Sequence, residues 1–191
     1  MVEVDLRETG DGHLVLLHDE TLDRTTNRTG SLTQFSLEQV QRLNAGNWQR
    51  IPTLEEALVV ADGALGMMLE LKVEGIGLEA CAVVGRSRFA GAVLYASFLF
   101  EELGRIRAAD PTAAIMPLLE ETLPTDPLRE AVKLKASHVG LDYRTLTPTL
   151  VRTFHNLGFL VFAYTVNDPR DIQQVRALGV DGVISDFPDR I

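Results

Sequence analysis

The chain alternates short apolar runs with longer segments in which apolar residues recur every three or four positions. Some runs are apolar throughout, as at 160–163, which is typical of strands buried on both faces of a parallel sheet. The pattern predicts strands at Val2–Leu6, His13–Leu17, Gly66–Leu71, Ala92–Ala96, Ala113–Leu118, His138–Leu141, Leu160–Thr165 and Gly182–Ser185. Strands that alternate with helices over short connections predict right-handed βαβ units.

The predicted helices carry start and stop signals. Thr53-Leu-Glu-Glu56 is a capping box, in which the first and last side chains accept hydrogen bonds from each other's backbone N–H groups. Further starts place an N-cap residue before proline, and glycines follow the last two of these helices. The starts are Thr125-Asp126-Pro127, Thr147-Pro148 and Asp168-Pro169, and the glycines are Gly158 and Gly179.

An alternation of this kind builds either an open doubly wound sheet or a closed (β/α) barrel. No G-x-G-x-x-G motif follows the first strand and no G-x-x-x-x-G-K-[ST] motif occurs, which weakens the nucleotide-binding open sheet. The region 8–51 departs from the alternation, with a Gly10-Asp11-Gly12 turn, a polar loop and a short helix opened by Ser36-x-x-Gln39. We predict one α/β domain over residues 1–191, a TIM-type (β/α) barrel with an insertion at about 8–51 near its ligand-binding end.

Composition narrows the partners of this domain. Its 191 residues include 18 Lys and Arg against 27 Asp and Glu, so the net charge is −9. The pI of about 4.9 argues against a nucleic-acid binder with a broad basic face. Cys81 is the single cysteine, so no intrachain disulfide forms. No apolar run reaches the roughly 18 residues of a membrane span, and the start lacks a signal-peptide pattern. We expect a cytoplasmic protein, and the sequence predicts no oligomeric state.

Two pairs of charged residues lie at strand spacing. Glu3 and Asp5 share one face of a strand, and Glu70 and Lys72 share one face of another. Each pair alone has a structural explanation, a solvated rim for the first and an ion pair for the second. Together, Glu3, Asp5 and Glu70 offer three hard oxygen ligands of the type that Mg²⁺ or Ca²⁺ prefers. Three carboxylates, a divalent ion and Lys72 sum to zero charge, so a phosphodiester can approach without net repulsion.

One histidine and one polar loop are further candidates. His18 ends an apolar run and precedes Asp19, a placement that suits an acid/base residue at a barrel mouth and equally a surface histidine at a loop start. The loop that begins at Arg24 holds two cations and four hydroxyl or amide side chains, and it either contacts phosphate or forms a polar turn. Trp48 and Phe98 are predicted as core residues, with substrate stacking as the alternative.

A set of short motifs occurs in one order along the chain. These are Glu3-Val-Asp5-Leu, Asp11-Gly12 followed by Leu-His18-Asp19, Leu22-x-Arg24-Thr25-Thr26, Ile51-Pro52-Thr53-Leu54-Glu55-Glu56, Leu69-Glu70-Leu-Lys72, Ser97-Phe98, Tyr164-Thr165-Val166-Asn167 and Gly179-Val-Asp181-Gly182-Val-Ile-Ser185-Asp186-x-Pro188-Asp189. The ordered set resembles the glycerophosphodiester phosphodiesterases, a branch of the phosphatidylinositol-phospholipase-C-like barrels. The resemblance runs nearly from end to end.

The resemblance implies a metal-dependent hydrolase of lipid and glycerol metabolism. Such an enzyme cleaves a small glycerophosphodiester to glycerol 3-phosphate and an alcohol. The resemblance implies that Glu3, Asp5 and Glu70 bind the divalent cation, Mg²⁺ or Ca²⁺. It implies neither a nucleic-acid partner nor a transmembrane segment.

The same resemblance implies roles for side chains around the metal. His18 resembles one of the family's two catalytic histidines, and Lys72 resembles the lysine that neutralises the phosphate. Lys72, Arg24 and Tyr164 are the candidate substrate-binding residues. Tyr164 stands where the family usually has tryptophan, and Ser185 stands where it usually has threonine, so an aromatic ring and a hydroxyl are kept.

The family begins with a strand that carries His-Arg-Gly and a helix after it, and no His-Arg pair occurs in the 191 residues. The resemblance therefore predicts a barrel that lacks this strand and helix on its N-terminal side. Three functions are open: an active phosphodiesterase, a catalytically impaired domain that binds metal or phosphodiester, and a related phospholipase-D-like lyase. The final product distinguishes them: the phosphodiesterase forms glycerol 3-phosphate, the impaired domain forms no product, and the lyase forms a cyclic phosphate.

Overall fold

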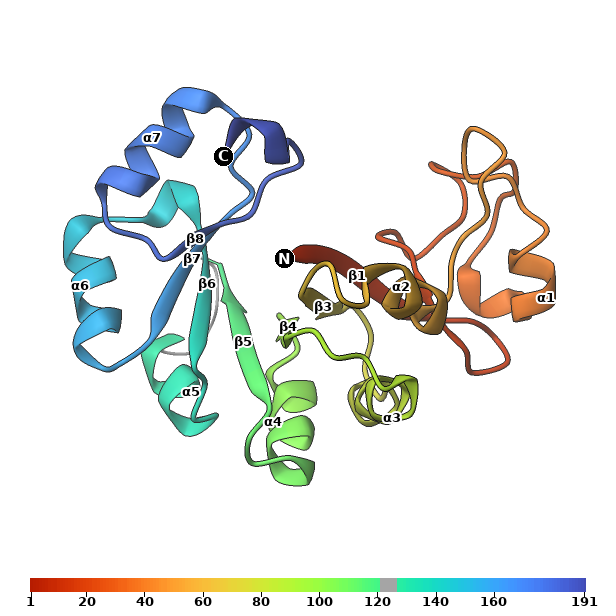
Figure 1. Cartoon of the computed structure of the whole chain (residues 1–191), viewed down its shortest axis with the longest axis horizontal. Coiled ribbons are helices and arrows are strands. Elements are labelled where there is room, and N and C mark those ends of the chain that lie inside the picture. Colours follow the sequence, from red (N-terminus) through yellow and green to blue (C-terminus); the bar gives the residue numbers. More distant parts are fainter. Residues whose placement is uncertain (121–126) are drawn as a thin grey trace.

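A computed structural model of the chain describes residues 1–120 and 127–191. Its centre is one eight-stranded sheet with the strand order β2-β1-β3-β4-β5-β6-β7-β8 (Figure 1). The strands are β1 (Val2–Glu8), β2 (Leu14–Leu16), β3 (Met67–Leu71), β4 (Val93–Ser97), β5 (Ala114–Leu119), β6 (His138–Asp142), β7 (Leu160–Tyr164) and β8 (Gly182–Val183). All the predicted strands are present, and their ends shift by no more than two residues.

The strand β2 is the exception to a parallel sheet. The other strands pair in parallel, whereas β2 pairs antiparallel with β1 and sets Leu16 opposite Leu6. The turn between them contains Gly12 at a φ of 83°, a left-handed conformation that glycine adopts without steric cost. The chain therefore folds back as a hairpin, and β2 lies inside the region that departs from the βα alternation.

The helices are α1 (Leu37–Val40), α2 (Leu54–Ala61), α3 (Gly77–Ser87), α4 (Phe100–Ala109), α5 (Pro127–Lys133), α6 (Pro148–Asn156) and α7 (Pro169–Ala177), with short 3₁₀ turns at Leu32–Gln34, Tyr143–Thr145 and Pro188–Arg190. The helices from α2 onward surround the outer side of the curled sheet, whereas α1 lies apart from it (Figure 1). Among the described residues, no helix is long and apolar enough to cross a bilayer.

The predicted helix starts agree with the structure wherever it describes them. Glu56 N donates to Thr53 Oγ1 over 3.2 Å and Thr53 N donates to Glu56 Oε2 over 3.0 Å, so the capping box is confirmed. Thr147 and Asp168 likewise accept hydrogen bonds from the first turns of α6 and α7. The start predicted at 125–127 lies outside the described residues except for Pro127, where α5 begins.

Alternate side chains of the strands form two apolar layers. The outer layer includes Leu6, Leu69, Leu71, Tyr95 and Ile115, and it packs against α2, α3 and α4 through residues such as Leu58, Val83, Leu103 and Ile106. The inner layer lies on the other face of the sheet and includes Met68, Leu94, Ala96, Met116 and Leu118. Because successive residues of a strand face opposite sides, these layers fix which residues face the interior of the curl.

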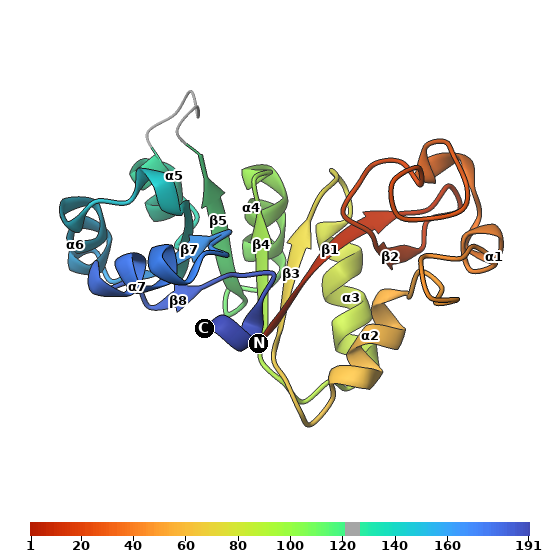
Figure 2. The ribbon, with the colours of Figure 1, turned by 90° about the horizontal axis from the view of Figure 1, so that it is seen from above.

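The curled sheet does not close on itself. Within residues 1–120 and 127–191, β1 and β8 form no pair with each other, and they lie apart in Figure 1. Figure 2 views the same sheet from above, with β8 on one side of the chain's two ends and β1 on the other. The sheet and its outer helices match a (β/α) barrel that is incomplete between β8 and β1, as predicted. The strand β1 is therefore an edge along residues 2–4, before its pairing with β2 begins.

Residues between β2 and α2 gather a small core of their own. Val15, Leu17, Leu22, Leu32, Val40 and Ile51 are buried together. Trp48 is not part of this core: its side chain is 90% exposed, so the prediction of a core tryptophan is wrong. Asn47 and Trp48 both adopt left-handed backbone conformations, which turn this loop outward.

Candidate active site

Three carboxylates meet on the inner face of the sheet. Glu3 and Asp5 lie on β1, Glu70 lies on the neighbouring strand β3, and the register places Asp5 beside Glu70. One oxygen from each of the three carboxylates lies within 4.8 Å of the others. The two-residue spacing seen in the sequence therefore brings these side chains together, because residues i and i+2 share one face of a strand.

Lys72 joins this carboxylate cluster from the end of β3. Its Nζ donates a hydrogen bond to Glu70 Oε1 over 2.7 Å and lies 3.4 Å from Asp5 Oδ1. The backbone N–H of Lys72 donates to the Leu6 carbonyl over 3.1 Å, so the parallel pairing of β1 and β3 continues to this residue. The ammonium group is thus fixed between the two strands that carry the carboxylates.

The electrostatics of the cluster favour an additional positive charge. Burial raises the pKa of Glu3 to about 8, and the negative charges of Asp5 and Glu70 add to the rise. Burial also raises the pKa of Glu70, although its hydrogen bond to Lys72 opposes this. Burial acts to lower the pKa of Lys72, but the hydrogen bond and charge of Glu70 and the charge of Asp5 together raise it. One ammonium group does not compensate three carboxylates.

A divalent cation fits this set of residues. Glu3 Oε1 is buried and has no hydrogen-bond partner among the residues that the structure describes. A buried oxygen of this kind is costly unless it is protonated or binds a cation. Glu3, Asp5 and Glu70 supply carboxylate oxygens, the ligands preferred by Mg²⁺ and Ca²⁺. The donor type, the grouping and the unpartnered oxygen therefore all suit such an ion.

His18 follows β2 and is held by several hydrogen bonds. Its Nδ1 lies 2.7 Å from Asp19 Oδ1, and its backbone carbonyl accepts from Arg7 Nε over 2.9 Å. The preceding residue, Leu17, donates its N–H to the Asp5 carbonyl over 3.0 Å. The backbone that carries the imidazole is thus bonded directly to the strand that carries two of the carboxylates.

Arg24 binds Asp19, the residue that also contacts His18. Its Nε donates to Asp19 Oδ2 over 2.6 Å and its Nη2 donates to Asp19 Oδ1 over 2.9 Å, so the contact is bidentate. The hydrogen bond from Arg24 is the main reason that the pKa of Asp19 is strongly lowered, and the contact with His18 adds to it. The structure places the guanidinium of Arg24 on a carboxylate of the protein.

Aromatic side chains line the inner face at β4 and β7. Tyr164 is half-buried, and its hydroxyl donates to the Leu119 carbonyl over 2.9 Å. The rings of Phe98 and Tyr164 meet edge to face with centroids 5.9 Å apart. Phe98 packs with the inner apolar layer, in agreement with the prediction of a core residue. Because the hydroxyl of Tyr164 is hydrogen-bonded to the backbone, its ring, and not its oxygen, is the part available for contact with a molecule bound at the inner face.

The sequence of the whole chain matches one family model. The model is that of the glycerophosphoryl diester phosphodiesterase family, and it matches residues 1–190. The chain belongs to this family. It is therefore an enzyme of the phosphoric diester hydrolase class, as the ordered motifs indicate.

Known members of the glycerophosphoryl diester phosphodiesterase family agree with this assignment. A glycerophosphodiester phosphodiesterase of Bacillus subtilis (strain 168) is 31% identical over 216 residues, which cover 98% of this chain and 74% of that protein. One from Caldanaerobacter subterraneus subsp. tengcongensis is 31% identical over 203 residues, covering 100% and 83%. The structure of an Oleispira antarctica phosphodiesterase in complex with the product sn-glycerol-3-phosphate superposes with a TM-score of 0.89 at 28% identity, covering 100% of this chain and 82% of that one.

Sequence reasoning about this phosphodiesterase missed the contact between Asp19 and Arg24. The sequence marks Asp19 only as the residue after His18, and it predicts Arg24 as a phosphate contact or part of a polar turn. The available signal was the spacing: an acid beside a histidine, with an arginine five residues later in a loop. That spacing alone does not show which way the loop turns.

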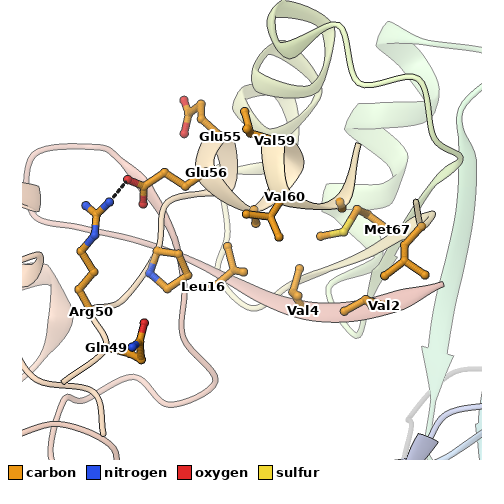
Figure 3. A pocket seen from close by; sticks show the side chains of 14 residues that line it. Val2, Val4, Leu16, Gln49, Arg50, Glu55, Glu56, Val59, Val60 and Met67 are labelled. Atoms are coloured by element: carbon orange, nitrogen blue, oxygen red, sulfur yellow. Dashed lines mark hydrogen bonds and ion pairs between the residues drawn. The ribbon is translucent and has the colours of Figure 1, made fainter. Parts of the chain in front are cut away.

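The phosphodiesterase also has an apolar groove on the outer face of β1 (Figure 3). Its volume is about 860 Å³, and its apolar lining includes Val2, Val4, Leu16, Val59, Val60 and Met67. The charged side chains Arg50 and Glu56 lie at one end and pair with each other over 2.6 Å. The carboxylates of β1 point to the opposite face, so this groove is separate from the candidate active site.

Proposed function

We propose that the chain hydrolyses glycerophosphodiesters to glycerol 3-phosphate and an alcohol with a divalent cation, Mg²⁺ or Ca²⁺. The observation that carries this proposal is the carboxylate cluster with Lys72 beside it. With a divalent cation bound, the charges of this site sum to zero, so a negatively charged phosphodiester can approach without net repulsion. The product-bound Oleispira antarctica phosphodiesterase supports glycerol 3-phosphate as the product class. The substrate is a small molecule, and the acidic surface of the chain gives no support to a nucleic-acid partner.

Each side chain has a role that follows from its charge. Glu3, Asp5 and Glu70 would hold the cation. When bound there, the cation supplies positive charge that offsets the phosphate and the charge that develops on it in the transition state. Lys72 would bind a non-bridging phosphate oxygen, while its contacts with Glu70 and Asp5 keep its ammonium group in place.

The reaction has two steps, and each moves one proton from the attacking oxygen and one proton to the leaving oxygen. A glycerol hydroxyl of the substrate attacks phosphorus and loses its proton, and the bond from phosphorus to the alcohol oxygen breaks. The released alkoxide gains a proton, and water then opens the cyclic phosphate to glycerol 3-phosphate. His18 would carry out one of these proton transfers, because an imidazole can both accept and donate a proton. The ring of Tyr164 would pack against the carbon skeleton of the glycerol.

The test is turnover of glycerophosphocholine by the 191-residue chain with Mg²⁺ or Ca²⁺, with glycerol 3-phosphate measured over time. We expect cation-dependent product that is lost in Glu70→Gln, which removes one ligand charge. Glu55→Gln is the matched control, because Glu55 lies on α2 at the groove, outside the cluster. Product that is independent of cation, or that is unaffected by Glu70→Gln, contradicts the proposal.

One observation favours a second function, cation and phosphodiester binding without turnover. Residues 2–4 of β1, which include Glu3, pair with β3 but lie beyond the pairing with β2, so this part of the site has an open edge in residues 1–120 and 127–191. In that case calorimetry detects cation binding to the chain while the assay yields no glycerol 3-phosphate. A cyclic phosphate as the final product would instead indicate the related lyase reaction.

A further inference from the structure

Asp19 and Arg24 form a chain of contacts that ends on the imidazole of His18. Arg24 holds both carboxylate oxygens of Asp19, at 2.6 and 2.9 Å. Asp19 Oδ1 in turn lies 2.7 Å from His18 Nδ1. The arrangement therefore has the order guanidinium, carboxylate, imidazole, with each member fixing the next.

The backbone beneath His18 is fixed independently of Asp19. Arg7 donates to the His18 carbonyl over 2.9 Å, and Leu17 donates to the Asp5 carbonyl over 3.0 Å. What these bonds leave free is rotation of the imidazole about its side-chain torsions. The contact with Asp19 removes that freedom, so its effect is on ring orientation rather than on the path of the chain.

The same contact selects a tautomer. A neutral imidazole carries a hydrogen on one of its two nitrogens. A carboxylate that accepts a hydrogen bond from the ring favours the tautomer with this hydrogen on the nearer nitrogen. The hydrogen bond from Arg24 and the contact with His18 lower the pKa of Asp19, so this carboxylate stays ionised and accepts. Nδ1 then carries the hydrogen, and Nε2 presents the lone pair that can take up a proton.

We propose that Asp19 and Arg24 are positioning residues: Asp19 holds His18 as the Nδ1–H tautomer with Nε2 free for proton transfer, and Arg24 holds Asp19. This inference rests on the proposed function, in which His18 transfers a proton during phosphodiester cleavage. When Nε2 accepts a proton, the ring becomes an imidazolium with two N–H groups. Asp19 stabilises that cation and does not itself take the proton. Arg24 acts through Asp19 instead of binding phosphate.

A purely structural role does not account for this arrangement. The side chain of His18 is 63% exposed and that of Arg24 is equally open to water. Ion pairs at such exposure contribute little to folding stability. The bidentate contact from Arg24 instead fixes the orientation of the Asp19 carboxylate. Two further charged side chains act on His18: Arg7 contacts its backbone carbonyl, and Glu70 interacts with it through the electrostatic field between the two side chains.

The decisive measurement is the tautomer of His18, read from long-range ¹H–¹⁵N correlations of ¹⁵N-histidine-labelled protein. The spectrum is recorded above about pH 8, where an ordinary imidazole is neutral. The chain has four histidines, and the spectrum of His18→Gln identifies the missing signal. We expect the Nδ1–H form in the unmodified chain and a shift toward the Nε2–H form in Asp19→Asn. An unchanged tautomer in Asp19→Asn overturns the proposal.

Asp23→Asn is the matched control for this spectrum. Asp23 lies in the same loop, and its Oδ2 accepts from Gly30 N over 3.0 Å, which the oxygen of asparagine reproduces. We expect the His18 signal to be unchanged in this variant. An equal shift of the tautomer in Asp23→Asn would mean that any disturbance of the loop moves the ring, and it would overturn a specific role for Asp19.

Kinetics with glycerophosphocholine separate positioning from substrate binding. We expect Asp19→Asn to lower kcat by about 10²-fold, the lower end of the range for an acid/base group, with KM changed by less than about threefold. Arg24→Gln should lower kcat by about tenfold in the same manner. A rise in KM at constant kcat in Arg24→Gln would show that Arg24 binds phosphate and would overturn its part of the proposal.

The tautomer and turnover measurements can contradict the positioning role and the proposed function independently of each other. A chain that forms no glycerol 3-phosphate but shows the Nδ1–H tautomer that depends on Asp19 contradicts the proposed function and leaves the positioning contact standing. A chain that turns over substrate with a tautomer that is indifferent to Asp19 contradicts the positioning role alone.

Discussion

The two faces of β1 meet very different surroundings. On the inner face Glu3 and Asp5 join Glu70 in a cluster with an unpartnered buried carboxylate oxygen. On the outer face Val2 and Val4 line an apolar groove, and Val2 is 40% exposed. One strand thus leaves polar atoms short of partners on one side and apolar atoms open to water on the other.

The comparison shows that the volume of a surface groove and the presence of reactive or charged groups are separate criteria for a functional site. The groove is large and apolar, and its charged residues Arg50 and Glu56 already neutralise each other. The carboxylate cluster, by contrast, sets three carboxylates against the one ammonium group of Lys72, so its charges are only partly compensated. Strand alternation sets both surfaces at once, so a one-residue shift in register would exchange them.

The largest expected effect is on the inner face, from His18→Ala. We expect turnover of glycerophosphocholine to fall by about 10²–10⁴-fold, the range for loss of an acid/base group, while cation affinity stays within about twofold. His155→Ala is the matched control, because His155 is exposed on α6 and pairs with Asp181. Activity retained in His18→Ala would remove His18 from the mechanism.

On the outer face, α2 offers a direct comparison between a covered and an uncovered side chain. Leu58 is 1% exposed and Val60 is 84% exposed. Leu58→Ala should lower the free energy of unfolding by about 2–5 kcal/mol, because it opens a cavity, and Val60→Ala by less than about 0.5 kcal/mol. Urea denaturation measures both. Equal losses would mean that the groove is covered in solution.

The free energy of unfolding should depend on pH through Glu3. Its pKa is about 8 when folded against 4.5 in the ordinary carboxyl, so the folded state binds more protons between these values. In the absence of a divalent cation, stability therefore falls as pH rises from about 4.5 to 8.

We expect this fall to be on the order of 2 kcal/mol, discounted from the full pKa difference because the side chain retains some contact with water. Glu3→Gln should flatten most of the fall, and added Mg²⁺ should reverse it in the unmodified chain. Chemical denaturation at several pH values measures both. A slope that is the same in Glu3→Gln would assign the dependence to other groups, of which Glu70 is the first candidate.

The smallest effect is expected from the charged end of the groove. Arg50→Gln breaks the pair with Glu56, whose side chains are both substantially exposed. We expect a loss of about 0.2–1 kcal/mol in the free energy of unfolding, reduced at high salt, with no change in turnover. A loss above that range would show that this pair orders the end of the groove.

Much of the fold and of the candidate site follows from local patterns. The strands are short apolar runs, and the caps at Thr53, Thr147 and Asp168 depend on neighbouring residues only. The cluster of Glu3, Asp5 and Glu70 could be predicted in part, because strand spacing fixes a shared face. That the two strands are neighbours depended on the resemblance to a family.

The remainder depends on contacts that spacing does not encode. The exposure of Trp48 follows from two consecutive left-handed residues and from Asn44, whose side chain accepts from the N–H of Trp48 over 3.1 Å. The partner of Arg24 depends on how the loop after His18 turns. Both lie between β2 and α2, where apolar periodicity is weakest.

That loop region is closed at its base. Leu16 donates its N–H to the Pro52 carbonyl over 3.0 Å, and Val15 and Thr53 form an isolated bridge, so the two ends of the segment meet. Loop length adds little to the entropy of such a closed segment. The residues after Arg24, 25–51, can therefore vary in length at little entropic cost, while His18, Asp19 and Arg24 stay next to the strands that carry the carboxylates.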